Sequence, residues 1–507
     1  MMFGENVAEM ETSIADRISE LPEFILHNIL STLDTKEAGR ASVLSKRWYQ
    51  VWSCIPVLDF RLQYYKMVYW DVSTKYGFNV DDDVIQSFLG FIDKTMQRYD
   101  TQKYRIRKLH LELPTPDKKI ESLVDRWIRI AVQNLVQELS INTLLHYTSD
   151  YRLPEILFRA KSLNVLKCRD IVLPYYETME LVSLEYLTLI QKNVDMIHTD
   201  MLQRIISFCP LVEFITTTDL GNISLPWERK QSKFKTSPLR KFVYGQFNRF
   251  STWPLEMNVV VLKNLRKLEI ICATITDDIV SELLYGLVAL ESLVLDSCSL
   301  LECIMISSVS LKELRIKKGL DLMKVTIDAP NLIKFWYNCE VNTSLSLIRV
   351  LDHCDAQFSP LLYTMEDFIT TDWFFKLKKI LEDSKFFQSL VIDLPSYLGI
   401  DVEEDRLRTA VTDRPYKLRE LKLHEPYTWD GIESPLMGLD GLFWICHPGV
   451  LSITTSLKNS SAESILDILK CKVQSWKHSL KSIEVEDIHG ASCHPWDTEF
   501  RFRLLWL

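Results

Sequence analysis

Apolar residues recur along this chain in two rhythms, and each rhythm predicts a different kind of element. Between Leu21 and Trp52 they lie three and four residues apart, which is the spacing of one face of an α-helix. From about residue 103 onward a short phrase takes over, in which an apolar residue is followed by two variable residues and then by alternating apolar positions. Alternation places successive side chains on opposite faces of a strand. The chain is therefore predicted to begin with short helices and to continue as an array of short strands.

The N-terminal segment is predicted to form short amphipathic helices. Pro22 suits a first helical turn, where its missing N–H costs nothing, and Asp34 or Thr35 and then Ser45 are suited to cap two further helices. A chain of about 40 residues rarely folds alone, and apolar side chains left in water would form a patch that needs a partner. The segment either packs on its own chain, which periodicity alone favours, or docks onto a second protein.

The identity and order of the residues in this segment favour docking. The motifs are Asp16-Arg17-Ile18, Leu21-Pro22, Ile29-Leu30 with Leu33, and Val43-Leu44-Ser45-Lys46-Arg47-Trp48 followed by Trp52. Their order and spacing closely resemble those of a plant F-box. The resemblance implies that the segment docks onto a Skp-type adaptor, which joins it to a cullin-based ubiquitin ligase. The residues that it maps onto the adaptor-binding surface are Leu21, Pro22, Ile25, Leu26, Ile29, Leu30, Leu33, Val43, Leu44, Ser45 and Trp48.

The strand phrase returns through most of the chain. Clear copies begin at Ile106, Val136, Leu163, Leu184, Leu239, Leu265, Leu290, Leu311, Leu332, Phe387, Leu418 and Leu480, and weaker copies begin at Leu211 and Val450. Between Val136 and Leu332 the copies start roughly 21 to 28 residues apart, which matches the leucine-rich-repeat period of about 20–29 residues. Because one unit cannot bury its apolar face alone, neighbouring units share a core. The predicted fold class is α/β: a short helical F-box, then an irregular leucine-rich-repeat solenoid with a curved parallel β-sheet on its concave face.

The alternate residues of the phrase point away from the core and form a candidate binding surface. Aromatic residues and arginine are enriched at binding hot spots, so Trp336 is the strongest single candidate, with Arg315, Lys317 and Lys334 beside it. These residues are predicted to bind a target protein. The alternative that an internal loop covers Trp336 stays open.

Interruptions in the rhythm divide the chain into predicted parts. A helix at Asp81–Met96 would cap the open end of the array, and the doubled spacing between Leu332 and Phe387 predicts an insertion with a helix near Thr364–Leu381. The end of the chain resembles the FBD-type C-terminus of plant F-box proteins with leucine-rich repeats. The parts are residues 1–12, a flexible N-terminus; 13–60, the F-box; 61–102, a linker and capping segment; 103–343, leucine-rich repeats; 344–385, a helical insertion; 386–487, C-terminal repeats with the FBD-like region; and 488–507, a C-terminal tail.

Composition and charge narrow the class of protein. The chain has 507 residues, of which 47% are apolar and 25% charged, as in soluble folded proteins. Its net charge of −9 argues against nonspecific nucleic-acid binding. No apolar run approaches the ~18 residues that span a bilayer, and no secretory signal is visible. The 11 cysteines show no paired CxxC spacing, which agrees with a reducing compartment. We expect an intracellular protein of the nucleus, the cytoplasm or both, without nucleic-acid or membrane partners.

Catalytic and metal-binding patterns are not expected in this chain. The sequence contains no GxGxxG, P-loop, GxSxG or HExxH motif, and Cys446-His447 and His489 with Cys493-His494 lack the paired spacing of a zinc site. No cofactor and no metal are predicted. One basic cluster could hold a polyphosphate or an acidic motif, although a solvated loop is favoured; it consists of Arg229, Lys230, Lys233, Lys235, Arg240 and Lys241.

These features together predict a non-catalytic, substrate-recognition subunit of a Skp-cullin-F-box (SCF) ubiquitin ligase. The N-terminal segment would bind the adaptor, and through it the cullin, while the repeats would hold an unidentified target protein. Tethering raises the effective concentration of the target to about the millimolar range. The alternatives are a protein-binding scaffold that drives no ubiquitin transfer and a sensor that holds a small ligand on the repeat surface.

Overall fold

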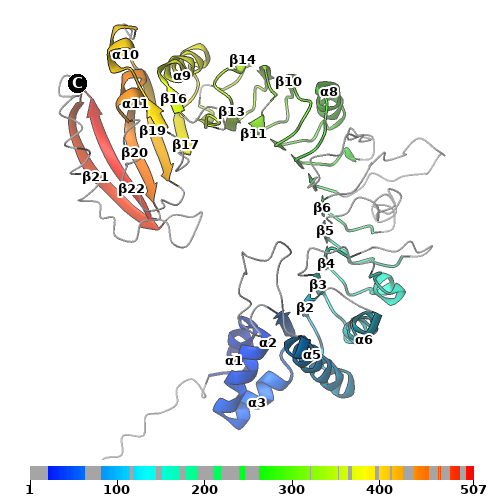
Figure 1. The fold of residues 1–507 in the computed structure, drawn as a ribbon. Helices are drawn as coiled ribbons and strands as arrows, with labels where there is room; N and C mark the ends of the chain where they lie inside the picture. Colours follow the sequence, from blue (N-terminus) through cyan, green and yellow to red (C-terminus); the bar gives the residue numbers. More distant parts are fainter. Residues whose placement is uncertain are drawn as a thin grey trace, which may run out of the picture. The chain divides into compact units, whose positions relative to one another are not determined.

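The chain divides into two compact units, Met1–Thr216 and Thr217–Leu507. In both units, short β-strands follow one another along the chain and are joined by helices or loops (Figure 1). The predicted α/β class with mainly parallel strands is confirmed. The computed structural model describes residues 21–62, 82–114, 118–143, 151–171, 179–190, 209–218, 239–245, 262–319, 321–351, 353–362, 368–393, 399–410, 414–425, 439–455, 466, 469, 480–490 and 498–506.

The first unit begins with the short helices that the sequence predicts. They are α1 (Glu23–Ser31), α2 (Thr35–Ala41), the 3-10 helix η1 (Ser42–Leu44) and α3 (Lys46–Ser53). The Asp34 carboxylate caps α2 by accepting the backbone N–H groups of Lys36 and Glu37 at 2.9 and 3.0 Å. The Ser45 hydroxyl caps α3 by accepting the N–H of Trp48 at 3.2 Å. Both caps satisfy N–H groups that a helix start leaves without a partner. The predicted flexible N-terminus, 1–12, lies outside the described residues.

A parallel sheet follows these helices in the first unit. Its strands pair in chain order, and they are β1 (Val57–Arg61), β2 (Lys108–Leu113), β3 (Glu138–Thr143), β4 (Val165–Arg169) and β5 (Tyr186–Ile190). The next strand is β6 (Phe214–Thr218), and the backbone N–H groups of Glu213 and Phe214 donate to the carbonyl of Glu185 beside β5. Every copy of the phrase from Ile106 to Leu211 thus contains or leads into a strand, as predicted.

Helices fill the connections of this sheet. They are α5 (Asp82–Gln102), α6 (Lys118–Gln133) and the 3-10 helix η2 (Glu155–Arg159). α5 confirms the helix predicted at Asp81–Met96 and packs against α6. The sequence reading missed α6, although the buried residues Ile120, Val124 and Ile128 recur at helical spacing.

The second unit contains a larger parallel sheet. Its parallel strands pair in chain order, and they are β7 (Lys241–Gly245), β8 (Lys267–Ile271), β9 (Ser292–Asp296), β11 (Glu313–Gly319), β13 (Lys334–Cys339), β15 (Asp355–Phe358), β17 (Ser389–Asp393), β19 (Tyr416–Glu425) and β20 (Cys446–Thr455). β22 (Thr498–Trp506) then pairs antiparallel with both β20 and β21 (Leu480–Gly490).

A second layer accompanies part of this sheet. After each of β9, β11 and β13 the chain forms a short strand of a separate parallel sheet, namely β10 (Cys303–Ser307), β12 (Lys324–Asp328) and β14 (Ser344–Arg349). Two helices extend this layer, since α8 (Asp277–Gly286) contacts β10 and α9 (Thr371–Ser384) contacts β14. The remaining elements are β16 (Phe368–Thr370) paired with β18 (Gly399–Asp401), α10 (Glu404–Ala410) and α11 (Leu439–Ile445).

The core of the second unit is built by the alternate apolar residues of the phrase. Leu314 and Ile316 of β11 and Phe335 and Tyr337 of β13 are buried. Four aromatic rings stack in this core with centroids 5.2–6.2 Å apart; they belong to Phe335, Tyr337, Phe358 and Phe387. Since alternate residues of a strand face opposite sides, the intervening residues are held on the other face of the sheet; they are Glu313, Arg315 and Lys317 of β11 and Lys334, Trp336 and Asn338 of β13.

The predicted helical insertion at 344–385 differs from the structure in its first part. It contains α9, as expected, but also β15, which joins β13 to β17 within the sheet. The repeat phrase is present here as Leu351, Cys354, Ala356 and Phe358, and the last three are buried. Cysteine and alanine replace the large apolar residues of other copies, so this repeat was missed.

The predicted C-terminal tail at 488–507 also differs from the structure. It contains β22, which lies between β20 and β21 and buries Phe500, Phe502 and Leu504. These residues alternate with exposed or half-buried ones, which is the pattern of a strand with one covered face. The end of the chain is therefore part of the sheet.

Candidate functional site

The three N-terminal α-helices have an interior of their own. Leu26 and Leu30 of α1, Ala38 of α2, and Trp48 and Val51 of α3 are 0–4% exposed. α1 and α2 both contact α3, so these side chains meet one another. Burying a leucine or tryptophan of this kind contributes about 1.5–3 kcal/mol, and this interior holds the helices in one arrangement.

Contacts with the first strand and with α5 anchor the helices to the rest of the first unit. The Thr35 hydroxyl accepts the backbone N–H of Asp59 in β1 at 2.7 Å. The buried Tyr99 hydroxyl of α5 donates to the carbonyl of Ile55 at 2.7 Å. In addition, the Arg98 guanidinium carbon lies 4.1 Å from the centroid of the Trp52 ring. The helices are therefore packed on their own chain, which is the alternative that their periodicity alone favours.

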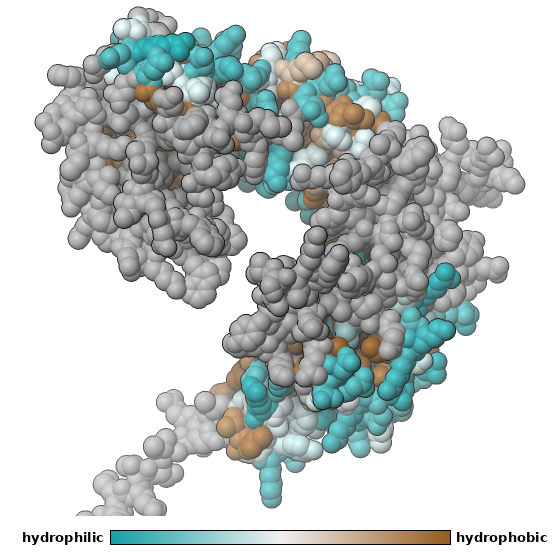
Figure 2. Space-filling view, in the orientation of Figure 1, coloured by the Kyte–Doolittle hydropathy of each residue, from teal (hydrophilic) through white to brown (hydrophobic). Residues whose placement is uncertain are grey.

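One apolar face of the helices nevertheless remains open. Val43 and Leu44 of η1 are 85% and 69% exposed. Phe24, Ile29 and Leu33 are also exposed, and Figure 2 shows brown, hydrophobic surface over these helices next to teal, hydrophilic surface. Exposed apolar side chains that lie together mark an interaction site, and Val43 and Leu44 are neighbours in the chain.

The structure divides the predicted adaptor-binding residues into two groups. Pro22, Ile29, Leu33, Val43 and Leu44 are exposed, and Leu21, Ile25 and Ser45 are partly covered. Leu26, Leu30 and Trp48 are buried. A direct contact requires exposed atoms, so these three residues, as they lie here, hold the helices in place beneath the exposed ones. Their assignment to the adaptor-binding surface stays a prediction.

The predicted target-binding residues lie together on one face of the larger sheet. Arg315 of β11 and Trp336 of β13 are paired in register, and the Arg315 guanidinium carbon lies 3.9 Å from the centroid of the Trp336 ring. Lys334 Nζ lies 5.9 Å from the same centroid, and Lys317 occupies the next outward position of β11. Trp336 is partly exposed, and among the described residues the Arg315 and Lys334 side chains lie over its ring.

Comparison with known proteins assigns both regions. Residues 18–58 match the model of the F-box domain, and residues 248–367 match the leucine-rich-repeat domain model described as At1g61320/AtMIF1, LRR domain. The chain is thus similar to an F-box domain near its start and to a leucine-rich-repeat domain further along. The F-box match spans α1 to α3, including the open face, and the repeat match includes Arg315 and Trp336.

The F-box and repeat chain has relatives in the plant Arabidopsis thaliana. It is 29% identical to the FBD-associated F-box protein At5g56370 over 218 residues, which are 41% of this chain and 45% of that protein. It is 31% identical to the F-box/FBD/LRR-repeat protein At5g56420 over 208 residues, 40% of this chain and 43% of that protein. A third relative, F-box/LRR-repeat protein 13, is 28% identical over 204 residues, 40% of each chain. The chain thus spans less than half the length of each of these relatives.

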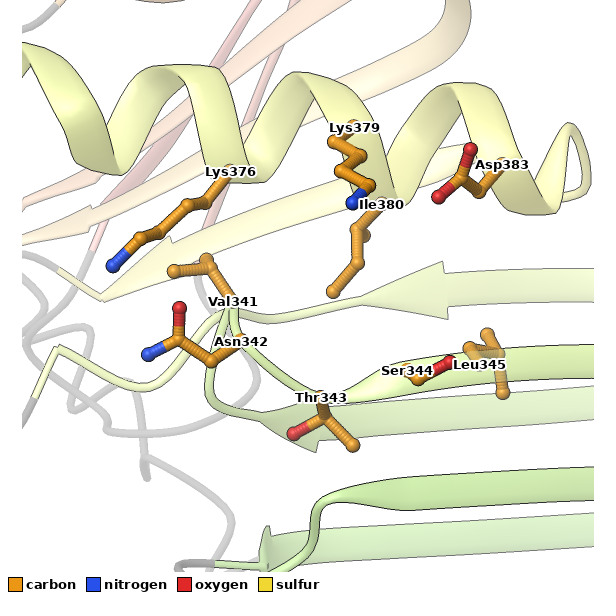
Figure 3. Close-up of a pocket in the computed structure, with 9 residues that line it drawn as sticks. All are labelled: Val341, Asn342, Thr343, Ser344, Leu345, Lys376, Lys379, Ile380 and Asp383. Atoms are coloured by element: carbon orange, nitrogen blue, oxygen red, sulfur yellow. The ribbon is translucent and has the colours of Figure 1, made fainter.

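Described residues outside the N-terminal helices line cavities at two places. One of about 340 Å³ opens between α9 and the start of β14, and Figure 3 shows Lys376, Lys379 and Ile380 of α9 pointing toward the turn at Val341 and Asn342. The other, of about 190 Å³, lies on β1 to β4 beside His110 and Asp59. Burial lowers the pKa of His110. The described lining residues of both cavities are rich in lysines, carboxylates, amides and hydroxyl groups, which suits the binding of polar groups.

The cysteine and histidine groupings do not form a metal centre within the described ranges. No group of three or more potential ligands occurs there. Cys446 is buried, and burial raises the pKa of its thiol, while His447 stacks on the Trp506 ring at 3.8 Å. His489 lies in β21, whereas Cys493 and His494 lie outside the described residues.

Of the predicted basic cluster, only some residues lie within the described ranges. Within the basic cluster, Lys241 forms an ion pair with Glu269 at 2.7 Å, and Arg229 to Lys235 lie outside the described residues. Burial also raises the pKa of the Cys168, Cys298 and Cys339 thiols to about 12, which disfavours the nucleophilic thiolate. None of the helices described is long and apolar enough to cross a membrane.

Proposed function

We propose that this protein is the substrate-recognition subunit of an SCF-type ubiquitin ligase. Its F-box would dock onto a Skp-type adaptor, and through it onto a cullin, while its repeats bind a target protein. The observation that carries the proposal is the open apolar face of the F-box, centred on Val43 and Leu44. A folded segment that leaves adjacent apolar residues in water has a partner to cover them.

The proposed docking energy comes mainly from the exposed residues of η1 and α1. Burying one valine or leucine contributes about 1.5–3 kcal/mol, so Val43 and Leu44 together contribute about 3–6 kcal/mol. Ile29 and Leu33 are half as exposed as Val43 or less and would contribute at the edge of the contact. Leu26, Leu30 and Trp48 would act indirectly, by keeping α1, η1 and α3 in place.

The repeats would bind the target on the sheet face that carries Arg315, Lys317, Lys334 and Trp336. In this proposal the chain makes and breaks no bond itself. It raises the rate of ubiquitin transfer by holding the target near a conjugating enzyme, because a tethered target has an effective concentration in about the millimolar range or higher. Its partners act inside the cell, so the protein would work in the nucleus, the cytoplasm or both.

Binding of the full-length chain to a purified Skp-type adaptor tests the proposal. The double variant Val43→Asp/Leu44→Asp should weaken binding by about 100-fold or more, since it removes the apolar contact and adds two charges. The double variant Val288→Asp/Val309→Asp is the matched control, because both valines are similarly exposed in the second unit. Circular dichroism should show that both variants keep the wild-type fold.

Failure of the wild-type chain to bind the adaptor would overturn the proposal. If the complex forms, the abundance of cellular proteins should be compared with and without the chain, with the proteasome active. Proteins that accumulate when the chain is removed support a ligase role. Adaptor binding without any such accumulation would reject ubiquitin transfer and favour a protein-binding scaffold.

A further inference from the structure

Ion pairs neutralise most charges around the Arg315 face. Glu269 pairs with Lys241 at 2.7 Å, Asp296 with Lys317 at 3.8 Å, and Glu313 with Lys334 at 3.9 Å. The Glu313 carboxylate also lies 3.4 Å from the Ser292 hydroxyl. These cross-strand pairs join β7 to β8, β9 to β11 and β11 to β13, and they engage the charged residues beside Arg315 on β11 and β13.

Arg315 is different from these residues. Within the described ranges its guanidinium makes no ion pair and no hydrogen bond, and its described interaction is with the Trp336 ring. Its partner in register on the other side is Val294, which offers no acceptor. Arg315 is partly covered, so its donors are not as freely hydrated as those of an arginine on an open surface.

This arrangement prepares Arg315 to bind an anion. A guanidinium carries five N–H donors in a fixed plane that matches a carboxylate. Stacking on Trp336 holds that plane in position and contributes about 0.5–2 kcal/mol by cation–π attraction. Since the arginine is already ordered, binding costs less side-chain entropy.

The surroundings indicate which anion is bound. Val294, Arg315, Trp336 and Gln357 lie side by side on successive strands. Strands are about 4.8 Å apart, so this row spans about 14 Å, the length of about four extended residues. Val294 is buried, and the partly exposed residues are cationic, aromatic and amide. The Trp336 ring supplies apolar surface beside the Arg315 charge, which complements a short peptide with an acidic residue next to an apolar one.

We propose that Arg315 and Trp336 anchor an acidic side chain in an extended peptide segment of the target protein. Arg315 would donate to the carboxylate, and the partly exposed Trp336 ring would contact the apolar neighbour of the acidic residue. This inference rests on the proposed function, because it states which chemical class of target the repeats recognise.

A library of random twelve-residue peptides displayed on phage tests the inference against the full-length chain. The expected result is enrichment of peptides with aspartate or glutamate beside an apolar residue. Binding of an enriched peptide, measured by fluorescence anisotropy, should be about tenfold or more weaker for Arg315→Gln, which is the effect of losing a charge-assisted hydrogen bond. Trp336→Ala should weaken it as well, and Arg315→Lys should fall between the wild type and Arg315→Gln, since lysine keeps the charge without the planar fork.

Lys379→Gln is the matched control. Lys379 is an exposed cation at the cavity between α9 and β14, without an ion pair among the described residues, so this variant removes the same charge from a different place. It should bind the peptides like the wild type. Equal losses in Lys379→Gln and Arg315→Gln, enrichment without acidic residues, or no enriched peptide at all would overturn the inference.

Adaptor binding, measured on the same proteins, separates this inference from the proposed function. Arg315→Gln should bind the adaptor normally, and Val43→Asp/Leu44→Asp should bind the peptides normally. If the adaptor binds and no acidic peptide does, the inference alone fails. If acidic peptides bind through Arg315 and the adaptor does not bind, the proposed function alone fails.

Discussion

Replacing Leu26 by alanine should loosen the N-terminal helices, whereas replacing Val43 by alanine should not. Leu26 of α1 is fully buried, and Val43 of η1 is mostly exposed. A buried Leu→Ala substitution costs about 2–5 kcal/mol, because transfer energy is lost and a cavity remains. A substitution at an exposed position away from special features changes stability by about 0.5 kcal/mol or less. Thus two residues that the sequence assigned to the same surface should behave in opposite ways.

Amide hydrogen exchange of the full-length chain measures this difference locally. In Leu26→Ala, the protection of amides in α1 and α3 should fall roughly 30-fold or more, which corresponds to about 2 kcal/mol. In Val43→Ala protection should stay close to the wild type, while the affinity for the adaptor should fall. Comparable loss of protection in the two variants would refute the division into supporting and contacting residues. Unchanged protection in Leu26→Ala would show that Leu26 does not hold the helices together.

Three further predictions concern stability and reactivity. Tyr99→Phe removes the hydroxyl that donates to Ile55 and leaves that carbonyl without its partner, so thermal unfolding of the first unit should occur at lower temperature, at a cost of about 1–3 kcal/mol. With iodoacetamide at pH 8, the exposed Cys303 should be alkylated quickly, as seen by mass spectrometry, and Cys168 and Cys298 slowly, because burial raises the pKa of both thiols to about 12. Burial, aided by Lys417, lowers the pKa of His447 from 6.5 to about 4, so the unfolded chain takes up this proton first as the pH falls. The urea midpoint should therefore decrease between about pH 6.5 and 4, and His447→Phe, which keeps a ring against Trp506, should reduce this decrease. An unchanged pH dependence in that variant would show that His447 contributes nothing to it.

The sequence predicted the repeat strands because their chemistry is local. In each clear copy the apolar positions carry large side chains at fixed spacing, and one strand of four or five residues is enough to display the alternation. β15 escaped prediction because Cys354 and Ala356 are small, and they are buried within a sheet in which Ala356 is paired in register with Phe335 of β13. That burial is a property of packing, and it is not visible in the residues of β15 alone.

The sequence predicted which residues belong to the candidate adaptor-binding segment, but not which of them are exposed. Helical spacing places Leu26, Ile29, Leu30 and Leu33 on one broad stripe, and a stripe of this width has a buried centre and an exposed edge. Which residues form the edge depends on the packing of α1 against α3, which buries Leu26 and Leu30 and leaves Ile29 and Leu33 exposed. The ion pairs formed by the neighbours of Arg315 could not be predicted from the sequence either. They join residues of separate repeats, and only the register of the sheet brings these residues together.

The anchoring of the N-terminal helices determines how they would bind an adaptor. A segment that folded only inside its partner would lose binding energy to the ordering of its backbone, about 1–2 kcal/mol for each residue fixed. Here the Thr35 to Asp59 and Tyr99 to Ile55 hydrogen bonds, together with the buried side chains of α1 and α3, order the segment beforehand. The energy of burying Val43 and Leu44 is then available for affinity. It follows that the amides inside α1 and α3 should already be strongly protected from exchange in the free chain. Adaptor binding should then change the exchange protection mainly around η1.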